Sequence, residues 1–256
     1  MTKSRTRIRS VLNVIRGIER QLDRRRVYPP SNTYADVVLL ALLAKTLRVA
    51  RAVCYLVEKG YADEAFGLGR TLIDIHLTAR YISNKNSDER AEQYAKFTYK
   101  EKESWLKVIE KYYSGSSILD PSNTAQKQVL KEAKAYPNPN WWTGKGSHTR
   151  DLALEEDTQE IDSSGNPISC EFDYRVIYRW TSHYVHCSAS TLHAYVPTRF
   201  GVFRSVPGRR PHRVDRLAIF NAMIYTAKTA ITVLRYLGTP LSSRTDNRLK
   251  LLLKQL

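Results

Sequence analysis

The sequence predicts an all-α protein, a helical bundle of six to eight helices with a basic extension at each end. In every long segment, apolar residues recur at the spacing of a helix that buries one face. No segment shows the strict alternation of apolar and polar residues that is typical of a half-buried strand. With 256 residues, of which 42% are hydrophobic, the chain is long enough to bury a full core.

The breaks between the apolar patterns set the expected organisation: a basic N-terminal helical arm at 1–30, a bundle domain at 31–240 and a basic tail helix at 241–256. Pro29 and Pro30 end the first pattern, because proline cannot continue a helix. Gly60 ends the second, and the short link after it makes the second and third helices antiparallel neighbours. The expected helices cover residues 4–26, 34–59, 62–83, 87–113, 123–135, 150–161, 171–195 and 213–237, followed by a short helix from 242.

Three local features carry expectations about packing. The apolar stripe of the first helix is expected to dock on the domain or on a second subunit, with a membrane or phosphate surface as the alternative. Gly67 and Gly69 lie inside the third helix, where glycine lowers helix propensity, so we expect them to allow close helix packing. Trp141 and Trp142 are expected to hold their loop against the core, with base stacking as the alternative.

The net charge of +16 is concentrated at the two ends of the chain. Residues 1–26 hold nine Lys or Arg and two Asp or Glu, and residues 199–216 hold six and one. Localised positive charge attracts polyanions, of which nucleic acid is the most common. An anionic membrane surface and an acidic protein partner remain open alternatives.

Cysteine content and hydropathy indicate a cytoplasmic protein without a membrane span. The three cysteines form no Cys-x-x-Cys pair, which argues against a disulfide framework and a structural zinc cluster. The N-terminus lacks the apolar region of a signal peptide, and the most apolar run, 37–44, is far shorter than a membrane span.

The segment 171–195 carries the best candidate site. On a regular helix it separates into a broad apolar face, which includes Val176, Trp180 and Val185, and a narrow polar stripe. From Arg175 to His193 the segment contains no Lys or Glu, which usually fill a solvated face. A polar face without function remains the alternative. The stripe consists of Arg175, Arg179, Ser182, His183, His186, Ser190 and His193.

Arginine and histidine at this spacing suit metal-independent RNA cleavage. The reaction needs a base for the 2′-hydroxyl, a proton donor for the leaving oxygen and a cation for the phosphorane charge. We assign the phosphate charge to Arg179 and the acid–base role to His186, with support from Arg175, Ser182 and His183. A zinc site at His183, His186 and Cys187 is the competing interpretation, although Cys187 points away from His186. We expect no metal and no cofactor.

On the third helix, Arg70 and Asp74 are four residues apart and share a face. They are expected to form a structural ion pair, or Asp74 orients an Arg or His of the 171–195 helix. In either case both residues support the site.

A second basic segment follows the candidate helix. Its arginines alternate with Phe200 and Phe203, a combination that suits phosphate contact with base stacking. A loop anchored by the two phenylalanines is the alternative. The arginines assigned to nucleic-acid binding are Arg199, Arg204, Arg209, Arg210 and Arg213.

The motif Arg179-Trp-Thr-Ser-His-Tyr-Val-His186 resembles that of the HEPN superfamily (higher eukaryotes and prokaryotes nucleotide-binding), whose ribonucleases carry Arg, four to six residues, then His. Arg70-Thr-Leu-Ile-Asp74 and the 178–186 segment also look like motifs of an uncharacterised bacterial helical family, a likeness that covers about residues 35–195. The HEPN resemblance implies a homodimer in which the Arg and His of each chain line one cleft. It also implies a metal-independent ribonuclease of phage defence or a toxin system.

The sequence thus leads to a metal-independent endoribonuclease of a bacterial defence or toxin-type system, which binds RNA in preference to other partners. Two alternatives use the same features differently. One is a non-catalytic nucleic-acid-binding or assembly subunit, and the other is a helical module that binds a partner protein.

Overall fold

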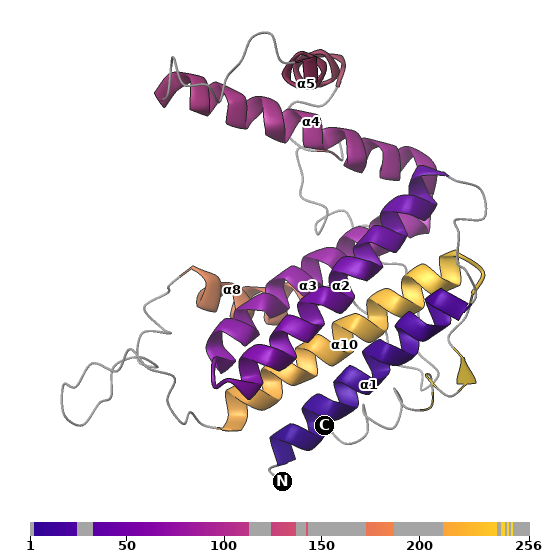
Figure 1. The fold of residues 1–256 in the computed structure, drawn as a ribbon, viewed down its shortest axis with the longest axis vertical. Coiled ribbons are helices and arrows are strands. Elements are labelled where there is room, and N and C mark those ends of the chain that lie inside the picture. The colour runs from indigo at the N-terminus through magenta and orange to yellow at the C-terminus, as the bar shows by residue number, and fades with distance from the viewer. Residues whose placement is uncertain are drawn as a thin grey trace, which may run out of the picture.

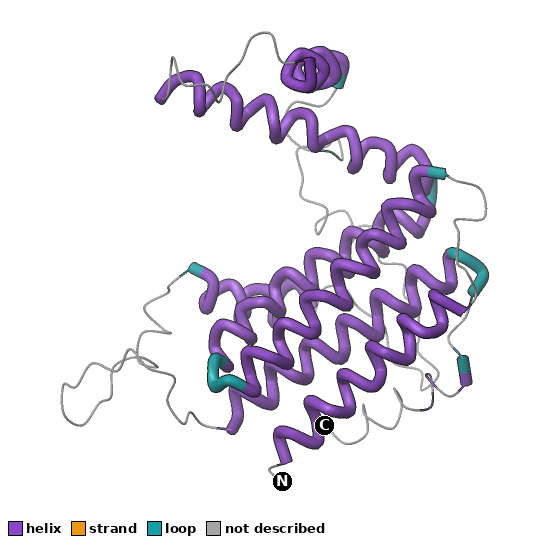
Figure 2. Tube along the Cα trace, in the orientation of Figure 1, coloured by secondary structure: helices purple, strands orange, loops and turns teal. Residues whose placement is uncertain are grey.

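The computed structural model describes residues 3–24, 33–112, 124–136, 142, 173–186 and 212–239, and Ser242, Ser243, Thr245 and Asn247. Within this part of the chain every regular element is a helix, which confirms the all-α prediction (Figure 2). The elements are α1 (Lys3–Arg24), α2 (Tyr34–Glu58), α3 (Ala62–Asn84), α4 (Ser87–Tyr112), α5 (Thr124–Ala135), the π-helix η1 (Asp173–Tyr178), α8 (Arg179–Val185) and α10 (His212–Tyr236).

These bounds agree with the helices expected from periodicity, except in the segment 171–195. There, η1 and α8 replace the single helix, and α8 ends at Val185 with His186 outside the helical conformation (φ −96°, ψ 19°). The acidic helix expected at 150–161 and the arginines Arg199, Arg204, Arg209 and Arg210 lie outside the described residues. Arg213 lies in the first turn of α10.

The bundle is centred on α2, α3 and α10, which pack against one another (Figure 1). α1 covers α10 and α2, and α8 crosses α3. The second half of α4 projects from the bundle, and α5 packs across it (Figure 1). The core therefore lies between helices from both ends of the chain.

The α2–α3 hairpin follows from three local signals. Thr33 caps α2, because its hydroxyl accepts a hydrogen bond from the Asp36 backbone N–H at 3.2 Å. Gly60 turns the chain with a φ of 88°, a conformation that favours glycine. Leu39 and Leu43, both fully buried, then pack α2 into the core. The predicted antiparallel pairing of α2 and α3 is confirmed.

The apolar stripe of α1 docks on the bundle, as predicted. Val11, Val14, Ile15 and Ile18 are no more than 2% exposed. The C-terminal segment fastens to the same helix, since the Ser242 backbone N–H donates to the Gln21 side-chain oxygen at 2.9 Å. α1 is therefore an integral layer of the bundle.

Trp142 holds its loop against the core, which confirms that expectation for this residue; Trp141 lies outside the described residues. The Trp142 side chain is 2% exposed and meets the rings of Tyr81 and Tyr94 edge-on, with centroids 5.5 and 5.1 Å away. Its carbonyl accepts a hydrogen bond from the Tyr136 hydroxyl at 3.1 Å. These contacts join the base of α4 and the end of α5 to α3.

Among the described helices, Val214–Tyr236 within α10 is long and apolar enough to cross a membrane, with a mean hydropathy of 1.5. However, 67% of its most apolar window is buried inside the bundle. A core helix of a soluble protein passes the same test, so this helix is weak evidence for a membrane span.

His76 of α3 is buried in the core beside Tyr225 of α10, with ring centroids 6.1 Å apart. Among the described residues, neither of its ring nitrogens has a hydrogen-bond partner. Burial, followed by the charges of Lys228 and Arg80, lowers the pKa of His76 from 6.5 to about 3. The imidazole is therefore neutral in the folded protein under ordinary conditions.

This burial makes stability depend on pH. Below pH 6.5 the unfolded chain binds a proton at His76 that the folded chain binds only near pH 3, so stability falls as the pH is lowered through this window. Between about pH 7.5 and pH 5 the loss amounts to about 2 kcal/mol. We expect His76→Leu to remove this pH-dependent loss of stability. Urea unfolding of both proteins at both pH values measures the difference, and an equal pH dependence in the two would contradict this account.

Candidate functional site

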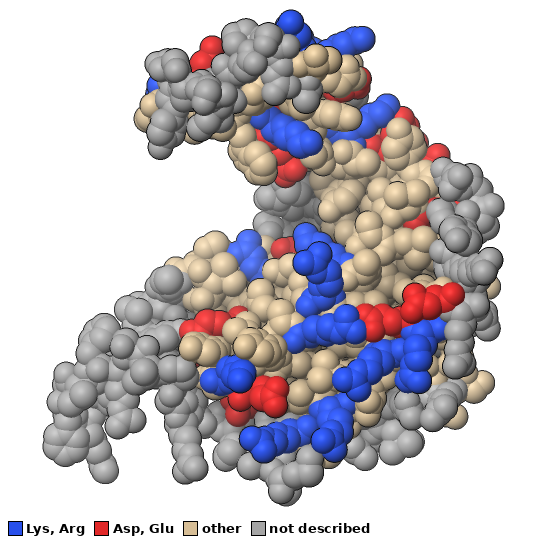
Figure 3. All heavy atoms as spheres, viewed as in Figure 1, with Lys and Arg blue, Asp and Glu red and all other residues tan. Residues whose placement is uncertain are grey.

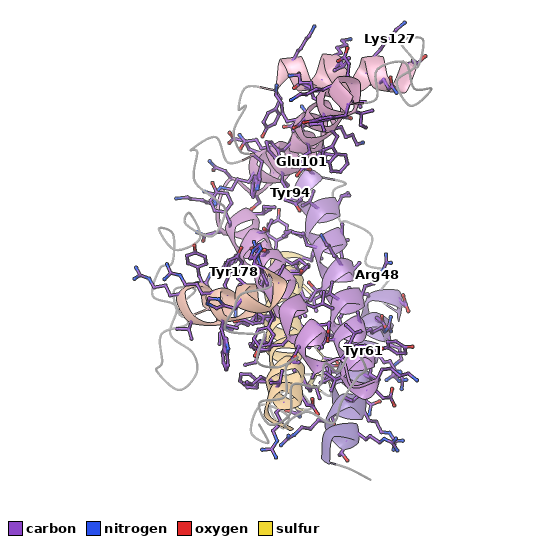
Figure 4. The ribbon with its side chains drawn as sticks, turned by 90° about the vertical axis from the view of Figure 1, so that its left-hand side faces the viewer. Arg48, Tyr61, Tyr94, Glu101, Lys127 and Tyr178 are labelled. Carbon is purple, nitrogen blue, oxygen red and sulfur yellow. The ribbon has the colours of Figure 1, made fainter. Side chains whose placement is uncertain are left out.

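The candidate site is built on η1 and α8, which run as one segment across α3 (Figure 4). Asp173, the first residue of η1, is 4% exposed and holds the start of the segment to α10. Its carboxylate accepts a hydrogen bond from the Tyr225 hydroxyl at 2.9 Å and pairs with the Lys228 ammonium. Single π-turns of this kind occur frequently at functional sites.

Small residues let α8 approach α3 closely. A Cβ at Gly69 would lie 3.0 Å from the Thr181 methyl group and 3.1 Å from the Asn221 amide nitrogen. One at Gly67 would lie 3.4 Å from the nearest atom, on Val185. The prediction of close packing is therefore confirmed for Gly69, whereas a Cβ at Gly67 would make an ordinary contact.

We expect Gly69→Ala to destabilise the protein by about 1–2 kcal/mol, because overpacking outweighs the roughly 1 kcal/mol gained in helix propensity. Gly67→Ala is the matched control on the same helix. Its methyl group would make only ordinary van der Waals contacts, with Val185 and Tyr184 at 3.4 Å or more, so the variant should be neutral or slightly stabilising. Chemical denaturation of both variants measures the contrast, and a Gly69→Ala protein as stable as Gly67→Ala would refute it.

At the centre of the site, Arg70 of α3 contacts the residues that flank α8 at its two ends. Its Nε donates to the Tyr178 hydroxyl at 2.9 Å, and its guanidinium carbon lies 4.9 Å from the centre of the Tyr178 ring. Its Nη1 meets Nε2 of His186 at the end of α8. One arginine thus fixes a tyrosine and a histidine that are eight positions apart.

The contact with Arg70 gives one ring nitrogen of His186 a defined neighbour. A guanidinium group has only hydrogen-bond donors and stays charged in proteins. In this geometry Nε2 of His186 therefore lies where it would accept from Arg70, beside a fixed positive charge.

The described part of the predicted polar stripe lies on the accessible side of the segment. Arg175, Arg179, His183 and His186 are exposed. Ser182 is half-buried and donates to the Tyr178 carbonyl at 2.7 Å, so its hydroxyl is engaged with the helix. Ser190 and His193 lie outside the described residues.

The expected apolar face is only partly buried. Trp180 packs edge-on against Phe66 but remains 39% exposed. Val176 and Val185, which were expected to be buried, are 44% and 48% exposed. This expectation was wrong because a π-turn winds more widely than the α-helix that was assumed, which changes the direction of the side chains.

Asp74 is exposed on α3, one turn beyond Arg70. Burial, and then the carboxylates of Glu101 and Asp74, raise the pKa of the Tyr94 phenol, so Asp74 is electrostatically coupled to α4. A contact between Asp74 and an arginine or histidine of the central segment stays a prediction. Arg70 itself reaches that segment directly.

Two features of the site were missed from the sequence. Tyr178 belonged to a quoted motif but received no role, and the Asp173–Tyr225–Lys228 anchor was not considered. The anchor joins residues 52 and 55 positions apart, for which a single sequence carries no signal. Within the described residues, no three His, Cys, Asp or Glu side chains gather to hold a metal ion, and Cys187 lies outside that part.

Figure 3 shows the molecular surface hollowed between the projecting α4–α5 pair and the region of α8. Figure 4 is viewed from the left-hand side of Figure 1, and it shows Tyr178 in the η1–α8 segment that crosses the bundle. The α8 region therefore borders a concave part of the surface (Figure 3).

Comparison with known proteins places the chain in a family. Residues 36–199 match the model of a family of unknown function, DUF5677. Neither the curated proteins nor the solved structures gave a significant match. The match runs from α2 to beyond α8 and includes Arg70, Tyr178 and His186. Because it spans more than half of the 256 residues, the chain belongs to the DUF5677 family.

Proposed function

We propose that the protein is a metal-independent endoribonuclease whose reacting group is His186. The observation that carries the proposal is the contact between Nη1 of Arg70 and Nε2 of His186. It holds an imidazole next to a permanent positive charge, on a surface that also presents Arg175, Arg179 and His183. Cleavage of a phosphodiester without a metal requires this combination of base and cation.

The proposed step is an attack by the RNA on its own backbone. A phosphate oxygen takes over the Arg70 donor, and Nε2 of His186 is then released to accept the proton of the 2′-hydroxyl. The 2′-oxygen forms a bond to phosphorus as the bond to the 5′-oxygen breaks. The 5′-oxygen leaves with a proton, and the other product ends in a 2′,3′-cyclic phosphate.

The remaining residues of the site have supporting roles in this scheme. Arg179 and Arg70 stabilise the charge that develops on the phosphorane, since arginine presents donors in a fork that matches phosphate. His183, exposed one turn before His186, supplies the proton to the leaving oxygen. Arg175 binds a neighbouring phosphate.

The biological setting in the proposal comes from the HEPN resemblance. It places the enzyme in the cytoplasm of a bacterium, in a phage-defence or toxin-type system, and as a homodimer whose two chains share one cleft. Sedimentation equilibrium tests the dimer: a mass of twice the chain supports it, and a monomer at assay concentration argues against a shared cleft.

Incubation of a mixed RNA pool with EDTA, and in parallel with divalent ions, tests the activity. Wild type, Arg179→Ala and His186→Ala are compared, each checked for folding by circular dichroism. We expect wild type to cut in EDTA and both folded variants to lose the cleavage. An RNA pool that stays intact with wild type under both conditions would refute the proposal.

A helical module that binds a partner protein is the second candidate, favoured by α4. Trp105, Val108 and Tyr112 lie three and four residues apart on one face of its projecting half. Their exposed fractions are 66%, 54% and 67%. Exposed apolar stripes commonly mark protein interfaces. Loss of a co-purifying partner in Trp105→Ala, with no RNA cleavage by wild type, would favour this candidate over the ribonuclease.

A further inference from the structure

The outer face of α1 carries a row of arginines. Arg5, Arg9, Arg16 and Arg20 are exposed, and their spacing keeps them within about 60° of one another around the helix. The side chains that α1 buries lie on the opposite face. The row therefore points away from the bundle and extends over about 22 Å of the helix axis.

α2 adds further cations beside this row. Lys45 and Arg48 are exposed on its outer face, and Arg51 of α2 forms an ion pair with Glu19 of α1, which joins the two helices. Figure 3 shows Lys and Arg side chains gathered over α1 and α2, with some carboxylates among them. We call this the α1–α2 basic surface; it comprises Arg5, Arg9, Arg16, Arg20, Lys45 and Arg48.

Most of this charge is not neutralised. Among the described residues, no carboxylate pairs with Arg5, Arg9, Arg16 or Arg48. Exposed cations of one sign repel each other and create a positive potential that attracts a polyanion. The surface is therefore suited to a ligand that brings many negative charges in a regular row.

The packing of α1 decides between a membrane and a nucleic acid. A basic amphipathic helix binds a membrane by inserting its apolar face between the lipids. In α1 that face is not available, because Val11, Val14, Ile15 and Ile18 are buried in the bundle. Five of the six cations are arginines, whose forked donors match phosphate oxygens.

We propose that the α1–α2 basic surface binds the phosphate backbone of a double-stranded nucleic acid. A duplex carries one charge per roughly 1.7 Å of its axis, so about 22 Å of duplex holds about 13 phosphates, and those on the near side can contact the row. This surface is separate from the candidate site: in Figure 4, Arg48 and Tyr178 project from opposite sides of the molecule. Binding there does not depend on RNA cleavage.

The test compares two variants that each lose three positive charges. Arg9→Gln/Arg16→Gln/Arg48→Gln alters the basic surface, and Lys102→Gln/Lys107→Gln/Lys111→Gln alters exposed positions on α4 as the matched control. Binding is followed by fluorescence anisotropy with two duplexes of one sequence, DNA and 2′-O-methyl RNA, which resists cleavage. Salt is varied between about 50 and 200 mM.

We expect the basic-surface variant to bind at least about tenfold more weakly, with a salt dependence reduced by about two to three units. The control should lose much less. The two duplexes show whether the surface prefers RNA or DNA. Equal losses in both variants, or unchanged binding in the basic-surface variant, would overturn the proposal. Vesicles that contain phosphatidylserine are tested in parallel. A variant that binds both duplexes as wild type does but no longer binds these vesicles would also overturn the proposal.

The outcomes separate this inference from the proposed enzyme. If wild type binds the duplexes but leaves RNA intact, the ribonuclease proposal fails and the surface stands. If the basic-surface variant cleaves a short RNA at saturating concentration as fast as wild type but binds duplexes poorly, both the ribonuclease proposal and the basic-surface proposal stand. If wild type cleaves RNA and the variant binds normally, only the surface is refuted.

Discussion

Replacing Arg70 with alanine should reduce metal-free RNA cleavage by about 10²–10³-fold, the range observed when a donor that stabilises a developing anion is removed. Two losses combine in this variant. The phosphate loses a cation, and His186 loses the contact that fixes its position. The rate of cleavage at saturating RNA, measured for the folded variant, gives the effect.

Arg70→Lys distinguishes a positioning role from simple charge. Lysine keeps the positive charge but cannot reach Tyr178 and His186 together with one planar fork. We expect it to restore only a small part of the lost rate. Arg175→Lys, on the exposed face of η1, is the matched control and should keep most of the activity. Full recovery in Arg70→Lys would show that the Arg70–Tyr178–His186 geometry is not required.

Replacing Asp173 with alanine should destabilise the protein by about 1–3 kcal/mol, the usual cost of leaving a buried hydrogen-bonding group without its partner. Asp173 is 4% exposed, and its loss leaves the Tyr225 hydroxyl and the Lys228 ammonium without their carboxylate. The start of η1 would then be free to leave α10. Urea unfolding monitored by circular dichroism measures the loss.

A second variant checks the cause of this loss. Asp173→Asn keeps an acceptor for Tyr225 but not the charge that faces Lys228, so its stability should fall between wild type and Asp173→Ala. An Asp173→Ala protein within about 1 kcal/mol of wild type would show that the anchor is energetically minor.

The helices were predictable because each is specified locally. The Pro29–Pro30 break, Gly60 and the apolar spacing of α2 and α3 lie within a few residues of the structure that they determine. The buried stripe of α1 likewise follows from its own sequence. Charge, spacing and burial all favoured the same conformation in these segments, which is why their bounds were close to those observed.

The arrangement of the site was not predictable in the same way. The polar stripe suggested that Arg179 would act beside His186, seven positions away on one helix. Instead, the arginine in contact with His186 is Arg70, 116 positions away on another helix. The π-turn at Asp173–Tyr178 depends on an anchor to α10 that appears only once the bundle has assembled.

The most direct test of the central claim is the identity of the RNA ends that wild type produces in EDTA. If His186 activates a 2′-hydroxyl, end-labelled RNA should yield a 2′,3′-cyclic phosphate, and the same RNA with deoxyribose at the cleaved position should stay intact. Folded His186→Ala should give neither product. Ends that carry a 3′-hydroxyl, cleavage of the deoxy-substituted RNA, or unchanged cleavage by His186→Ala would contradict the account.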